Sequence, residues 1–166
     1  MEEEHTSKAS GANLAVSKKF SVVVAKFIRG RKLDKAKSLM ESVLTKTVAV
    51  PFKKHNRDLG HKRGIGPGRY PIKVVEVMLS LLKSAEMNAS NKGLDVDALF
   101  VKSIIVNKGT STMKGGRHRG RAAKRTHINL ILEERENKKK TVKKDSKKVE
   151  VKEEKKEASK KGEEKK

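Results

Sequence analysis

Apolar residues recur at spacings of three and four in two segments near the start of the chain, and this spacing predicts two helices. The first covers about residues 17–30. Ser17 is a suitable N-cap, because its hydroxyl can accept a hydrogen bond from an otherwise unpaired amide of the first turn, and Gly30 ends the pattern. The second helix covers about residues 33–46. We expect the apolar stripes of both helices to be buried.

The longest helix is predicted over about residues 71–91. Pro71 suits its first position, where the missing amide hydrogen of proline needs no partner, and Gly93 is typical of a helix C-terminus. The apolar residues of this segment form a one-sided stripe, made of Val75, Met78, Leu82, Ala85 and Ala89. This helix should therefore pack one face on the core.

Three segments predict strands. Residues 12–16 are a short candidate, residues 99–106 are rich in β-branched side chains, and residues 127–132 alternate, with Ile128, Leu130 and Leu132 on one face. The last two strands flank about 20 residues of basic, glycine-containing chain, so we expect a long antiparallel hairpin. Arms of about ten residues at about 3.3 Å each would reach roughly 30 Å.

Three further segments lack periodicity. Residues 1–11 predict a short flexible lead. Residues 51–69 hold four glycines, two prolines and six basic side chains against one acid, which indicates an extended loop. Residues 138–166 hold 14 lysines, seven acids and four apolar residues, too few to offset chain entropy, so we expect disorder there. One folded domain is expected over residues 12–137.

Charge then narrows the choice of partner. The 166 residues include 42 lysines and arginines against 20 acids, a net charge of +22. This surplus indicates a polyanionic partner, with nucleic acid ahead of an anionic membrane surface. No apolar run reaches the roughly 18 residues that span a bilayer, and the tail has no apolar face for lying on one. Cysteine is absent, which removes disulfides, thiolate catalysis and cysteine-based zinc sites and fits an intracellular protein.

The segment 115–125, GGRHRGRAAKR, is the most specific candidate site. It contains His118, three glycines, no acid and five cations, which are Arg117, Arg119, Arg121, Lys124 and Arg125. Arginine pairs with phosphate bidentately, and glycine lets the backbone approach a crowded groove. We expect this tip to bind phosphates. The alternative is a disordered basic loop in an otherwise ordinary domain.

The loop at 51–69 is a second basic candidate. Together with the residue after it, the loop supplies six cations and three ring side chains, namely Lys53, Lys54, His55, Arg57, His61, Lys62, Arg63, Arg69 and Tyr70. Histidine and tyrosine rings can stack on unpaired RNA bases. Two histidines among lysines, without a carboxylate pair, make a poor metal site. For any single residue the alternative is a solvated position.

No enzyme motif is complete. GHKRGIGPGR lacks the GxxxxGK[ST] pattern of a phosphate-binding loop. Asp95 and Asp97 suit the turn after the third helix better than a catalytic pair, and no Ser-His-Asp constellation can be assembled. We therefore expect no catalysis, no cofactor and no metal ion.

Six motifs together resemble a known family. They are FIRG (27–30), LDKAKSLM (33–40), VPFKKHN (50–56), GPGRYPIK (66–73), AEMNASNKGLDVDAL (85–99) and RGRAAKRTHINLIL (119–132). The set is similar to the large-subunit ribosomal protein family numbered twenty-two in bacteria and seventeen in eukaryotes. VPFKKHN and GPGRYP resemble the archaeal and eukaryotic branch. The resemblance covers about residues 12–136.

The resemblance implies a mixed α/β fold of the α+β kind, with three helices on a small three-stranded antiparallel sheet and an extended hairpin over about residues 99–132. It implies a structural constituent of the large ribosomal subunit in the cytoplasm, which binds large-subunit rRNA, supports assembly and contacts neighbouring ribosomal proteins. The family's hairpin lines the polypeptide exit tunnel, where its tip would meet nascent chains. The loop here is shorter than the resemblance leads us to expect and lacks aromatic residues, so its tip should project less far.

The resemblance also implies rRNA contacts for body and hairpin-arm residues, namely Ser17, Lys18, Lys19, Arg29, Arg31, Lys32, Lys108 and Lys114. The competing hypothesis is an architectural or chromatin DNA-binding protein, which the basic loop and the lysine-rich tail would suit equally well. The six motifs favour the ribosomal interpretation.

Overall fold

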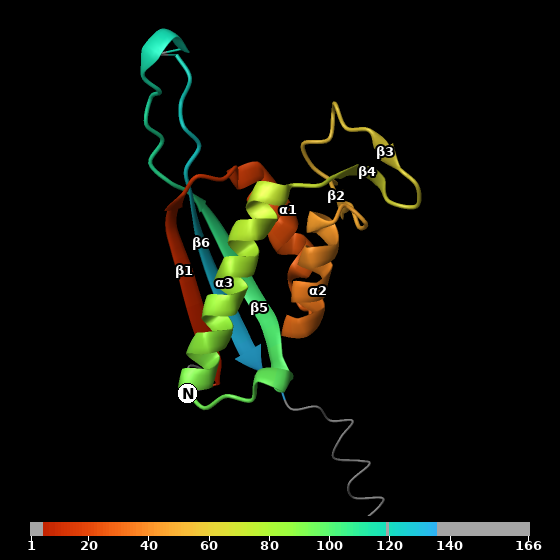
Figure 1. The fold of residues 1–166 in the computed structure, drawn as a ribbon, viewed down its shortest axis with the longest axis vertical. Coiled ribbons are helices and arrows are strands. Elements are labelled where there is room, and N and C mark those ends of the chain that lie inside the picture. Colours follow the sequence, from red (N-terminus) through yellow and green to blue (C-terminus); the bar gives the residue numbers. More distant parts are fainter. Residues whose placement is uncertain (1–4, 119, 136–166) are drawn as a thin grey trace, which may run out of the picture. The chain divides into compact units, whose positions relative to one another are not determined.

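The computed structural model describes residues 5–118 and 120–135, with His118 described by its backbone alone. The first four residues of the predicted lead, Arg119 of the predicted tip and the lysine-rich tail lie outside this description. Figure 1 traces the described elements in chain order.

Three helices form where the apolar spacing predicts them, α1 (Lys18–Ile28), α2 (Leu33–Leu44) and α3 (Ile72–Asn91). Ser17 occupies the N-cap position of α1, as predicted, but its hydroxyl makes no capping hydrogen bond. Its carbonyl oxygen instead accepts from the amide of Ser21 at 2.9 Å and from the Ser21 hydroxyl at 2.9 Å. The predicted hydroxyl cap is therefore wrong, although the predicted helix start is right.

The end of α3 follows from one glycine. Gly93 has φ = +73°, a conformation that glycine adopts at little cost. It lets the amides of Gly93 and Leu94 turn back to the carbonyls of Ser90 and Ala89, at 3.0 and 3.1 Å. The Leu94 side chain packs against the core, completing a helix-ending motif of the Schellman type.

The main sheet has three antiparallel strands in the order β1-β6-β5. Their bounds are β1 (Thr6–Leu14), β5 (Leu99–Lys108) and β6 (Thr126–Glu134). The central strand confirms the predicted alternation, because Ile128, Leu130 and Leu132 are all fully buried. Direct pairing of β5 with β6 confirms the predicted antiparallel hairpin.

The helices bury their apolar stripes against this sheet. In Figure 1, α3 runs alongside β1, α1 packs on β5, and α2 packs on α3. The largest fully buried side chains come from all of these layers and include Ile28, Leu33, Met40, Met78, Leu82, Leu99 and Leu130. One core therefore joins the helices to the sheet, and the fold is the predicted mixed α/β class.

The N-terminal strand begins earlier than predicted. Residues 6–11 belong to β1 rather than to a flexible lead, and they pair with β6 from Thr6 opposite Glu133 onward. The buried side chains of this stretch are small and partly polar, so its sequence lacks the hydrophobic alternation that predicts a strand. The hydroxyl of Ser7, a fully buried residue, donates to the carbonyl of Ala85 in α3 at 2.7 Å. Small residues let α3 approach the strand closely.

The segment predicted as an extended loop contains a second, small sheet. Its strands are β2 (Val50–Pro51), β3 (His61–Lys62) and β4 (Gly66–Arg69), in the order β2-β4-β3. Phe52 is 2% exposed and stacks edge-on against the Phe20 ring at 5.4 Å. The segment is thus anchored to α1 by one aromatic residue, while most of its other side chains face solvent.

Beyond β5 and β6 the hairpin continues through residues 109–118 and 120–125. Backbone amides of Gly109, Ala123 and Lys114 donate to carbonyls across the ribbon at 2.9, 2.7 and 2.9 Å. A Cβ at position 109 would lie only 3.1 Å from the Arg125 backbone, so glycine permits this close approach. Figure 1 shows the ribbon leaving the end of the sheet and closing in a short turn at Gly116–His118.

Side chains cover parts of both outer edges of the main sheet. On β1, Lys92 Nζ donates to the Thr6 carbonyl at 2.9 Å and Asn88 Nδ2 donates to the Lys8 carbonyl at 3.0 Å. On β5, a guanidinium nitrogen of Arg29 donates to the Ile104 carbonyl at 3.1 Å. Covered edges resist pairing with strands of other chains.

Candidate nucleic-acid interface

The predicted basic segments gather at one end of the body. Figure 1 shows the hairpin extension, the start of α1 and the segment between β2 and α3 at the same end of the main sheet. Two cavities join these elements, and both include Lys18 and Lys19. These two lysines lie in the first turn of α1, between the two basic segments.

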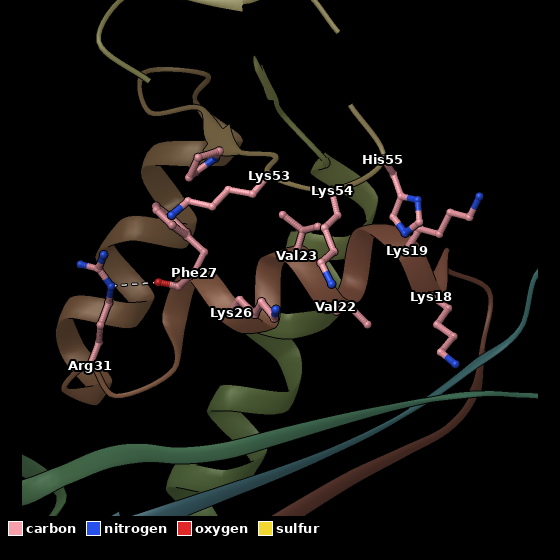
Figure 2. A pocket seen from close by; sticks show the side chains of 11 residues that line it. Lys18, Lys19, Val22, Val23, Lys26, Phe27, Arg31, Lys53, Lys54 and His55 are labelled. Carbon is pink, nitrogen blue, oxygen red and sulfur yellow. Dashed lines mark hydrogen bonds between the residues drawn. The ribbon is translucent and has the colours of Figure 1, made fainter. Parts of the chain in front are cut away.

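The first cavity, of about 570 Å³, lies between α1 and the residues that follow β2. Figure 2 shows its side chains reaching in from both elements. It brings together six of the predicted residues, Lys18, Lys19, Arg31, Lys53, Lys54 and His55. Residues more than 30 positions apart in sequence thus form one basic site.

The second cavity, of about 450 Å³, lies between α1 and the hairpin. Its predicted residues are Ser17, Lys18, Lys19, Lys108, Lys124 and Arg125. Arg125 is half-buried and its guanidinium donates to the Asn13 carbonyl at 3.5 Å, so it also helps to attach the hairpin to the end of β1. The basic surface therefore continues from the loop across α1 to the hairpin.

A third cavity, of about 410 Å³, contains Lys62, Arg69 and Tyr70. The Lys62 ammonium lies 5.4 Å from the centre of the Tyr70 ring, and the Arg69 guanidinium lies 5.6 Å from the centre of the Phe20 ring. A cation beside a ring face is attracted by the ring's quadrupole. Tyr70 therefore orients a cation in this structure, and its stacking on a base stays a prediction.

The three predicted cations between α1 and α2 have different surroundings. Arg29 covers the β5 edge, and the Lys32 ammonium lies 5.8 Å from the centre of the Phe100 ring. Arg31 lies in the first cavity, where its Nε donates to the Phe27 carbonyl at 2.9 Å and its guanidinium lies 5.2 Å from the centre of the Phe27 ring. Arg29 and Lys32 thus have structural partners as well as positive charge.

The remaining predicted residues are solvent-exposed. On the loop these are Arg57, His61 and Arg63, and on the hairpin they are Lys114, Arg117 and Arg121. Arg119 and the side chain of His118 lie outside the described residues. None of these six side chains lines the three cavities described above, and their exposure makes them accessible to a partner outside the chain.

Sequence reasoning missed five residues of the first cavity, namely Val22, Val23, Lys26, Phe27 and Pro51. Lys26 lies seven and eight residues after Lys19 and Lys18, a spacing that puts all three on one side of a helix. That spacing was a usable signal for Lys26. The apolar spacing of α1 also predicts burial of Val23 and Phe27, but both are only partly buried, at the border of the core. Only packing reveals where such a stripe stops being buried.

Among residues 5–118 and 120–135, no group of three or more histidine, cysteine, aspartate or glutamate side chains comes together to hold a metal ion. No helix in the described part of the chain is both long enough and apolar enough to cross a membrane.

A small α+β body whose cations gather at one end, with a basic hairpin extending from that end, has the charge distribution that is typical of nucleic-acid-binding proteins. Comparison with known families then gives the particular family. The model for ribosomal protein L22p/L17e matches residues 9–133, and the chain belongs to this family. This confirms the resemblance carried by the six sequence motifs.

Relatives named large ribosomal subunit protein uL22 match most of the chain. The protein from Methanopyrus kandleri is 41% identical over 145 residues, which cover 81% of this chain and 91% of the relative. That from Methanosphaera stadtmanae is 38% identical over 141 residues, covering 80% and 91%. That from Methanococcoides burtonii is 40% identical over 136 residues, covering 80% and 89%. Family membership makes the chain a structural constituent of the ribosome.

Proposed function

We propose that this protein binds large-subunit rRNA through the surface that runs from the 51–69 segment across the start of α1 to the hairpin. The observation that carries the proposal is that two basic cavities share Lys18 and Lys19 and so make one continuous cationic surface. The names of the relatives, which place those proteins in the large ribosomal subunit, support rRNA of that subunit as the polyanion.

The mechanism is electrostatic. Each lysine or arginine that meets a phosphate releases condensed counterions, so affinity depends steeply on salt. Recognition rests on RNA shape and backbone more than on base edges, because the chain has only four phenylalanines, one tyrosine and no tryptophan. The protein acts as a non-enzymatic scaffold in cytoplasmic ribosomes, where it supports subunit assembly and contacts neighbouring ribosomal proteins.

The hairpin gives this scaffold its reach. In the described parts of this extension, residues 109–118 and 120–125, exposed cations lie along both arms, and three backbone hydrogen bonds named above join the arms. We propose that surrounding rRNA fixes this ribbon along the wall of the polypeptide exit tunnel, where its tip meets nascent chains. The missing aromatic residues and the short loop favour a tip that ends close to the wall.

The test is the salt dependence of binding between the full chain and large-subunit rRNA, for wild type and two double variants. Lys18→Ala with Lys19→Ala should make the negative slope of log K against log salt shallower by roughly 1.5, at about 0.7–0.9 per lost phosphate contact. Lys35→Ala with Lys83→Ala removes the same charge from exposed positions elsewhere and should leave the slope unchanged. Equal effects of the two variants, or a wild-type affinity independent of salt, would contradict the proposal.

A second measurement separates the ribosomal function from the DNA-binding alternative. The chain should sediment with large ribosomal subunits and not with chromatin or nucleoid. In an assembled subunit, the density for residues 109–125 should lie along the tunnel wall. Sedimentation with DNA alone would favour the architectural DNA-binding protein.

A further inference from the structure

The cavity between α1 and the residues after β2 combines two chemistries. Val22, Val23, Phe27 and Pro51 give it an apolar floor, and all of its other lining residues are basic. In Figure 2, Val22 lies on α1 between Lys18 and Lys26, and Val23 lies on the same helix beside Lys54 of the opposite segment. A site that only neutralised phosphates would need no apolar floor, so the floor indicates a ligand with an apolar part.

The cations lie on both sides of that floor. Lys18, Lys19 and Lys26 come from α1, and Lys53, Lys54 and His55 come from the segment after β2. No carboxylate lines the cavity. A matching ligand therefore carries more than one negative charge beside an apolar part.

Arg31 closes one end of the cavity in a fixed orientation. Its Nε donates to the Phe27 carbonyl at 2.9 Å, and its guanidinium lies 5.2 Å from the centre of the Phe27 ring. Figure 2 marks this hydrogen bond. A guanidinium plane held beside an aromatic ring is a surface on which a nucleobase can stack.

We propose that this cavity receives one unpaired nucleotide of the rRNA, with its base on the apolar floor and its flanking phosphates on the two rows of cations. The inference rests on the proposed rRNA binding and adds a ligand to one part of that surface. The volume of about 570 Å³ falls within the roughly 300–1,000 Å³ of pockets that bury small organic ligands. A nucleotide combines the two chemistries of the lining, because its base has apolar faces and its ribose carries a phosphate on the 5′ side and another on the 3′ side.

An acidic, apolar peptide from a neighbouring protein fits less well. A peptide brings an amide donor at each residue, and the lysine and arginine side chains that line the cavity can only donate. Of the polar side chains in the lining, His55 is the one that can accept. The phosphate oxygens of RNA are acceptors and the ribose hydroxyl can also accept, so both match this lining.

Val22 allows a test that leaves the core intact. It lines the cavity and is half-exposed, but it belongs neither to the buried core nor to the residues packed against it. Met87, 64% exposed on α3, is a matched apolar control on another helix and away from the three cavities of the basic end.

The experiment places the photo-crosslinker p-benzoylphenylalanine at position 22 of the full chain, in large subunits of the source organism. The expected result is a crosslink to one nucleotide that is unpaired in the rRNA secondary structure, with no such crosslink from position 87. A crosslink from position 22 to a paired nucleotide, a crosslink to a protein, or no crosslink would overturn the proposal.

A binding measurement covers the case in which the crosslinking variant does not assemble. The full chain carrying Val22→Gln should bind large-subunit rRNA about fivefold more weakly, because the base loses part of its apolar support. Its salt slope should equal that of wild type, since no cation is lost. Met87→Gln should bind within about twofold of wild type. If Val22→Gln matched Met87→Gln while wild type kept its steep salt dependence, the nucleotide site would be wrong and the rRNA-binding function would stand.

Discussion

Replacing one buried hydroxyl tests whether the chain is ordered from Thr6 onward. Ser7 is fully buried in β1, and its hydroxyl donates to the Ala85 carbonyl of α3 at 2.7 Å. Ser7→Val removes this hydrogen bond and adds carbon where α3 and the strand already touch. If residues 1–11 were a flexible lead, the same substitution would have no effect on stability.

The magnitude follows from two contributions. Loss of the hydrogen bond costs about 1 kcal/mol of the free energy of unfolding. Forcing extra carbon into a packed interface costs about 1–3 kcal/mol more. The sum, roughly 2–4 kcal/mol, corresponds to a fall in Tm of roughly 6–16 °C for a domain of this size.

The assay is thermal and urea unfolding of the full chain, followed by circular dichroism. Ser10→Val is the matched control, because Ser10 lies on the same strand with its side chain exposed, and its effect should stay within about 0.5 kcal/mol. Equal stabilities of Ser7→Val and Ser10→Val would refute the buried position of β1.

Three further results are expected. Leu130→Ala in the fully buried central strand should lower the free energy of unfolding by about 2–5 kcal/mol in urea titrations, and a loss below 1 kcal/mol would contradict its place in the core. Gly93→Ala, at φ = +73°, should lower the free energy of unfolding by about 1 kcal/mol and lower Tm with it. Gly60→Ala, with open space at its Cβ, should leave Tm unchanged, and equal Tm values for the two variants would refute the helix-ending role of Gly93. Arg117→Ala with Arg121→Ala should reduce incorporation into large subunits without changing Tm, and normal incorporation would make the hairpin cations dispensable.

The sequence could predict the elements whose residues repeat with a clear period. The α3 stripe and the alternation of Ile128, Leu130 and Leu132 identify their elements because burial on one face imposes that period. Local chemistry was also readable, as at Gly93, where the helix end depends on one backbone conformation. The family motifs extended the prediction from the class of fold to the arrangement of its three helices and sheet.

The candidate site could be predicted only in part. Basic residues stand out in a sequence whatever the fold, so the cations of the loop, α1 and the hairpin were identified. The individual partners of these cations could not be predicted, because the partners can lie far away in the sequence. Arg29, for example, donates to the carbonyl of Ile104, a residue 75 positions away. The apolar floor of the first cavity was missed for the same reason. Val22 has the same residue type as its buried neighbour Val24, and only the packing of α1 distinguishes them.

By itself the sequence determined where the three helices and the two hairpin strands lie along the chain, the charge of the basic end, and the family. Each of these follows from residue type and local spacing. The tertiary structure alone decided that β1 starts at Thr6, that three short strands join after α2, and that Lys18 and Lys19 lie between two basic segments. The physical reason is that these features depend on contacts between residues far apart in the chain. The bond from Ser7 to Ala85 spans 78 positions and leaves no periodic signal in the residues around it.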